Sequence, residues 1–150
     1  MDDLLKKFNA AGVRYLLIGS QAMRLLGMPP FSIDWDFFIP PRDDANLERL
    51  NALLSDDLDA PLEPLGSRGE NFIQTYRTGW GIRQFHLGLL GVPTFDDAEA
   101  AAIVHHTEHG TPVPVLSGQH LLAAKEAANR PQDQLDVQFL QELRRAGKLR

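Results

Sequence analysis

The alternation of apolar and polar positions predicts helices and strands that follow one another along the chain. Leu4, Leu5 and Phe8 share one helical face, and residues 13–18 then form a strand because branched and aromatic side chains dominate them. The same criteria predict further helices over residues 20–26, 43–54, 96–106, 118–128 and 131–146, and further strands over residues 32–39, 72–77, 82–87 and 112–116. This order predicts one α/β (α+β) domain over residues 1–150, in which helices flank a mixed β-sheet.

Individual serine, proline and aromatic residues predict where some of these helices and strands begin, end or lie in the sheet. Ser20 has the hydroxyl group that commonly caps the first turn of a helix. Pro112 and Pro114 lack the N–H group that a central strand needs, so their strand is expected at the edge of the sheet. Residues 78–81 are expected to form a hairpin turn, from which Trp80 would pack against the protein or stack on a base.

The strand expected over residues 32–39 carries two aspartates among apolar neighbours. Residues i and i+2 of a strand point to the same side, so Asp34 and Asp36 are expected to direct both carboxylates to one face. Two adjacent negative charges beside apolar surface are costly unless a cation neutralises them. The pair therefore predicts a site for Mg²⁺ (or Mn²⁺) that also contacts the phosphates of a nucleotide. The alternative interpretation is an exposed edge strand with a polar face.

The composition narrows the class of protein. A chain of 150 residues with 43% hydrophobic and 23% charged residues is typical of a globular domain. Its net charge of −5 argues against bulk electrostatic binding of nucleic acid, and without cysteine it has neither disulfides nor thiolate ligands. The first residues are acidic where a signal peptide is basic, and no long apolar run follows. We therefore expect a cytoplasmic protein without membrane association.

The order strand, Gly19-Ser20, helix, loop and Asp34-x-Asp36 strand resembles the nucleotidyltransferase superfamily. The later run from residue 121 to residue 136 contains Lys125, Arg130-x-x-Asp133 and Asp136, and it is similar to the end of small stand-alone members. The resemblance covers residues 13–39 and 113–140. Some of these small members belong to toxin–antitoxin or abortive-infection modules.

This resemblance implies a nucleotidyltransferase-like fold and the transfer of a nucleoside monophosphate from an NTP to a hydroxyl group. The acceptor would be a protein, an RNA or a small molecule. Asp34 and Asp36 would be catalytic and would hold the metal ion. Gly19 and Ser20 would contact the phosphates, since a residue without Cβ lets backbone N–H groups come close.

Lys125 and Arg130 would also bind the nucleotide in such a protein. An ammonium group suits phosphate as a point charge, and a guanidinium group holds phosphate or carboxylate with two parallel hydrogen bonds. Arg130, Asp133 and Asp136 could equally form a salt-bridged surface between two helices. We favour the structural role for the two aspartates.

The chain departs from the superfamily pattern at one position. Active members carry a third carboxylate on a later strand, and the corresponding residues 82–87 contain neither Asp nor Glu. Gln84 and His86 share one face of that strand, so one of them is expected at the position. His86 can act as a ligand or as a base, which makes it the third predicted catalytic residue. The alternative is a catalytically degenerate binding protein. Such a protein would act as a homodimer or as one partner of a two-component module.

Histidines near residue 106 form a second cluster of candidate ligands. His105 and His109 are four residues apart, which is the spacing of metal ligands on one helical face. No carboxylate motif accompanies them, so the favourable interaction of a cation with a helix C-terminus explains them better.

Overall fold

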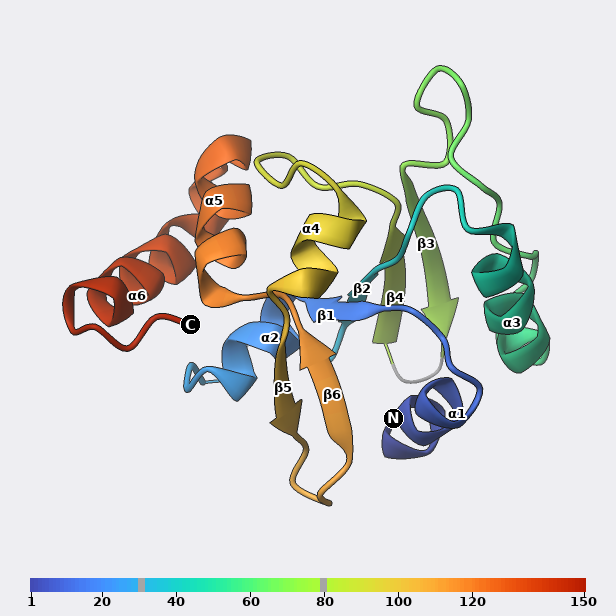
Figure 1. The fold of residues 1–150 in the computed structure, drawn as a ribbon, viewed down its shortest axis with the longest axis horizontal. Coiled ribbons are helices and arrows are strands. Elements are labelled where there is room, and N and C mark those ends of the chain that lie inside the picture. Colours follow the sequence, from blue (N-terminus) through green and yellow to red (C-terminus); the bar gives the residue numbers. More distant parts are fainter. Residues whose placement is uncertain (30–31, 79–80) are drawn as a thin grey trace.

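The described part of the chain forms one mixed sheet of six strands. Helices lie on both sides of this sheet (Figure 1). The computed structural model describes residues 1–29, 32–78 and 81–150. The strands are β1 (Leu16–Ile18), β2 (Trp35–Phe38), β3 (Ile73–Thr78), β4 (Gly81–His86), β5 (Ile103–His106) and β6 (Pro112–Val115), in the order β3-β4-β2-β1-β6-β5. Pairs β2–β4 and β1–β6 are parallel, and the other neighbours are antiparallel. This arrangement confirms the predicted mixed sheet flanked by helices.

In the described residues, six α-helices flank the sheet. They are α1 (Asp2–Ala10), α2 (Gly19–Leu25), α3 (Asp44–Leu54), α4 (Phe95–Ala100), α5 (Gly118–Ala128) and α6 (Gln134–Arg145), with a 3₁₀ turn over Pro131–Asp133. Figure 1 shows α5 and α6 together at one end of the molecule and α1 and α3 at the other. The side chains of Asp43, Thr94 and Ser117 each accept a backbone N–H at the start of α3, α4 and α5. These caps satisfy N–H groups that a helix leaves unpaired, and so they fix where the helices begin.

An aromatic cluster fills the core on one face of the sheet. The ring of Phe37 lies 5.7 Å from Phe8 of α1, 5.9 Å from Tyr15 and 5.5 Å from Phe85 of β4, measured between centroids. Phe38 points to the opposite face, where its ring lies 5.1 Å from Phe95 of α4. Because Asp36 and Phe38 alternate with Phe37, the buried cluster holds β2 so that Asp36 projects on the α4 side.

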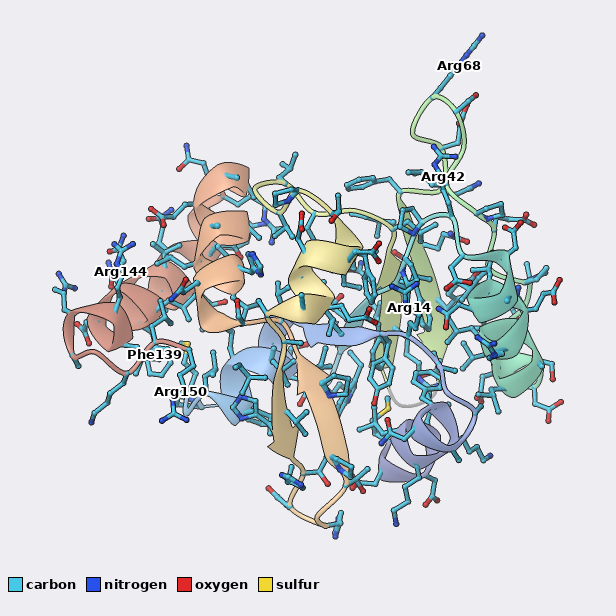
Figure 2. All side chains as sticks on the ribbon, viewed as in Figure 1. Arg14, Arg42, Arg68, Phe139, Arg144 and Arg150 are labelled. Carbon is cyan, nitrogen blue, oxygen red and sulfur yellow. The ribbon has the colours of Figure 1, made fainter. Side chains whose placement is uncertain are left out.

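Arg14 connects three parts of the chain ahead of β1. Its guanidinium group binds Asp43 at 2.9 Å, Asp96 at 2.6 Å and Glu99 at 3.0 Å, and it lies 5.2 Å from the centre of the Phe95 ring. Figure 2 shows the Arg14 side chain between α3 and α4. These bonds tie the beginnings of α3 and α4 to the sheet.

Acid is expected to weaken the fold through Asp43. The N–H of Asn46 and the guanidinium of Arg14 hold the pKa of Asp43 below its usual value of 3.8. The stabilisation is therefore complete above that value and is lost as the pH falls through the lower native pKa, because the unfolded chain takes up the proton first. Urea unfolding at about pH 5 and about pH 3 measures this loss. Asp43→Asn cannot titrate, so its loss should be smaller; an equal loss in both proteins would contradict the assignment.

The helix predicted over residues 96–106 is wrong beyond residue 100. Helix α4 ends at Ala100, and Ile103–His106 form β5, in which Val104 pairs with Pro114 of β6. Branched side chains favour a strand, and pairing with β6 decides between the two structures. His105 and His109 therefore do not share a helical face. Within the described residues no group of three or more His, Cys, Asp or Glu side chains could hold a metal ion.

The edge position that Pro112 and Pro114 predicted for their strand, β6, is wrong. The strand lies between β1 and β5, and β5 forms that edge. Its register contact with β1 joins Leu17 to Val115, and the N–H of Leu116 donates to the Leu17 carbonyl at 3.1 Å. Both contacts follow the prolines in sequence, so the missing N–H groups at residues 112 and 114 do not interrupt the pairing with β1.

The predicted hairpin is present, since β3 and β4 pair in register from Ile73↔His86 to Thr78↔Gly81. Trp80 and the rest of residues 79–80 lie outside the described residues, as do residues 30–31 of the loop before β2. In the described parts of the chain, every helix is too short or too polar to cross a bilayer.

Candidate functional site

Two adjoining cavities lie on the face of the sheet that carries Asp36. One, of about 400 Å³, is lined by Gln84 and His86 of β4 and by residues of α5. The other, of about 380 Å³, is lined by Ser20, Gln132, Leu135 and Asp136. Both share the residues Gly19, Asp36, Lys125, Arg130 and Asp133. The fold thus brings the four residues predicted to bind nucleotide, which come from both ends of the sequence, to one place beside Asp36.

Gly19 is needed where β1 passes into α2. Its φ is +71°, which other residues rarely adopt, and a Cβ there would lie 3.0 Å from Cβ and Cγ of Asp36. The Gly19-Ser20 turn therefore lies directly against the Asp36 side chain. Ser20 does not cap α2 as predicted, because the helix begins one residue earlier and its N-cap, Ile18, makes no side-chain hydrogen bond. The Ser20 residue instead lines the cavity.

The two aspartates have different partners, although a continuous strand would place them together. Strand β2 begins only at Trp35. Asp34 Oδ1 accepts the N–H of Ile82 at 2.9 Å, so its carboxylate binds the beginning of β4. Asp36 Oδ1 lies 3.5 Å from His86 Nε2, four residues further along β4. Asp36 lines both cavities, whereas Asp34 lines neither of these cavities of the described chain.

His86 is the residue of β4 that faces Asp36. Strand β4 runs parallel to β2, and Gln84 is the register partner of Asp36. The Gln84 amide, however, donates to Thr75 Oγ1 at 3.2 Å. The side chains of His86 and Asp36 are 15% and 18% exposed, so their contact is largely shielded from solvent. Of the two residues predicted for the third position, His86 is the one whose side chain contacts Asp36, while Gln84 is the register partner of Asp36.

An ion-pair network of residues from α5, α6 and the turn between them lines the cavities. Lys125 Nζ lies 2.8 Å from Asp136 Oδ2 and 3.4 Å from Asp133 Oδ1. Arg130 donates two hydrogen bonds to Asp133, of 2.7 Å and 3.1 Å. Burial raises the pKa of Asp133, but the bonds from Arg130 and Lys125 outweigh it and hold that pKa below its usual value. Asp133 also raises the pKa of Arg130, with a smaller contribution from Asp36.

The apolar part of the cavity was not predicted from the sequence. Phe72, Leu89 and Leu90 line the 400 Å³ cavity, and Leu90 is 61% exposed. The leucines stand between Gly88 and Gly91, a pattern that marks a loop but does not show what the loop faces.

The side chains of the site fit a divalent ion only when the phosphates of a bound nucleotide supply further oxygen atoms. Mg²⁺ prefers oxygen ligands and is commonly held by one or two carboxylates and substrate phosphates. Asp36 supplies one carboxylate, while one oxygen of Asp34 is engaged by Ile82. Asp36 and His86 alone do not form a closed protein site, so an ion here would need phosphate oxygens as well.

Comparison with known proteins finds similarity among solved structures and none among family models or curated sequences. Among solved structures, the chain is similar to an antigenic nucleotidyltransferase-like protein from Paracoccidioides brasiliensis, with 20% identity and a TM-score of 0.47. The match covers 81% of this chain and 60% of that one, so it spans less than two thirds of that protein.

Proposed function

We propose that the protein is a nucleotidyltransferase-like domain that binds an NTP in this cavity and transfers its nucleoside monophosphate to a hydroxyl group. The observation that carries the proposal is the meeting of Gly19, Ser20, Lys125 and Arg130 beside Asp36 in one cavity. The sequence resemblance assigns the same residues to the nucleotide.

Each side chain has a role in this proposal. Gly19 lets the phosphates come close to the backbone, and Arg130 binds their oxygens through the N–H groups that Asp133 does not accept. Asp36 would hold Mg²⁺ or Mn²⁺ together with the phosphates, and the ion would neutralise their charge. Asp34 lines neither cavity and one of its oxygens accepts the Ile82 N–H, so we assign the ion to Asp36. His86, if neutral, would accept the proton of the acceptor hydroxyl.

A second candidate function is nucleotide binding without transfer. The contact between His86 and Asp36 favours it, because loss of an anionic ligand weakens a site for a hard cation. Such a protein would act through a partner, as in a two-component module of the toxin–antitoxin type.

Substitution of His86 by aspartate separates the two candidates. His86→Asp is expected to raise incorporation of label from α-phosphate-labelled NTPs about tenfold, because it restores an anionic oxygen ligand. The assay would supply cell extract as the source of acceptor and Mg²⁺ as the ion. His86→Asn is the matched control, since it changes the side chain without adding charge. Nucleotide binding with no incorporation by either wild type or His86→Asp would favour the binding function. No binding of any of the four ribonucleoside triphosphates would refute both.

A further inference from the structure

The cations of the cavity are already paired with carboxylates. Asp136 approaches Lys125 at 2.8 Å, and Asp133 is shared between Lys125 and Arg130. Asp133 is 4% exposed, and the Lys125 side chain is 13% exposed. Solvent screens the charge of Lys125 weakly, so Asp133 and Asp136 cancel much of the attraction that Lys125 would exert on a phosphate. The Arg130 side chain is 55% exposed, so Asp133 cancels less of the charge of that guanidinium.

The charge of the cavity is therefore unfavourable for a free polyphosphate. The ionisable residues that line the 380 Å³ cavity comprise two cations, Lys125 and Arg130, and three carboxylates, Asp36, Asp133 and Asp136, so one negative charge is in excess there. A metal-free triphosphate brings further negative charge, whereas its Mg²⁺ complex carries two fewer negative charges and places a cation beside Asp36. The cavity should consequently bind the Mg²⁺ complex of a nucleotide more tightly than the metal-free nucleotide.

We infer that Asp133 and Asp136 determine this specificity: by neutralising Lys125, and Arg130 in part, they make nucleotide binding depend on the divalent ion. The inference rests on the proposed nucleotide site and goes beyond it. Asp133 in addition holds the Arg130 fork with two hydrogen bonds, so it positions that group as well as cancelling its charge. Asp136 forms an ion pair with Lys125, so its effect on nucleotide binding comes from its charge.

Asp136→Asn tests the inference because it removes one charge and keeps the shape of the side chain. Titration calorimetry would compare the Kd of the most tightly bound ribonucleoside triphosphate in EDTA with its Kd in excess Mg²⁺. We expect metal-free binding to tighten about tenfold while binding of the Mg²⁺ complex changes less, so the ratio of the two Kd values falls. Glu142→Gln is the matched control, because it removes one charge from exposed surface of the same helix. It should leave the ratio unchanged.

A second variant shifts the ratio in the opposite direction. Lys125→Gln leaves Asp136 unpaired, so metal-free binding should weaken more than binding of the Mg²⁺ complex and the ratio should rise. Circular dichroism would establish that each variant is folded, and either folded variant suffices for the test. Folded variants that bind nucleotide with the wild-type ratio would overturn the inference. Wild-type protein that binds none of the four triphosphates in Mg²⁺ would instead overturn the proposed function.

Discussion

Asp36→Asn is expected to weaken Mg²⁺-dependent nucleotide binding at least about hundredfold. Asparagine retains the size of the side chain but removes the anionic oxygen that would face both the ion and the phosphates. Asp36 lies against the Gly19-Ser20 turn and lines both cavities, so no other carboxylate of the described residues holds the same place. Titration calorimetry with each ribonucleoside triphosphate in excess Mg²⁺ measures the effect.

Asp34→Asn is the control that distinguishes the two aspartates. The amide oxygen of asparagine can still accept the N–H of Ile82, so the beginning of β4 should remain in place. We expect this variant to bind nucleotide within about threefold of wild type. Equal losses in Asp34→Asn and Asp36→Asn would show that the two carboxylates act as one pair, and the assignment of the ion to Asp36 would then be wrong.

Phe37→Ala is expected to lower the free energy of unfolding by about 4 kcal/mol. Phe37 has no exposed surface, and its ring contacts the rings of Phe8, Tyr15 and Phe85. Truncation removes this burial and leaves a cavity between α1 and the sheet, which the surrounding backbone fills only in part. Urea unfolding at neutral pH, monitored by circular dichroism, measures the loss.

Phe72→Ala is the matched control for this prediction. The same atoms are removed from a residue that is 37% exposed, so the expected loss is about 1 kcal/mol. A loss at Phe37 no larger than that at Phe72 would mean that the aromatic cluster does not form the core of the protein.

Local sequence patterns were sufficient where the relevant interaction is local. The helical faces of α1, α5 and α6 and the alternation along β2 follow from apolar spacing within a few residues. The need for glycine at residue 19 is likewise visible at the change from strand to helix. The same spacing failed for residues 103–106, where helix and strand are both compatible with the sequence and the partner strand β6 decides.

The sequence by itself determined the mixed sheet, the order of its helices and strands apart from β5, and the residue types available for binding a phosphate. Only the tertiary structure decided where those groups point. Asp34 turns to the N–H of Ile82, His86 faces Asp36, and Lys125 and Arg130 share Asp133. The physical reason is that backbone geometry fixes the side of a strand or helix within a few residues, whereas the partner of a charged side chain depends on segments that meet only when the sheet has formed.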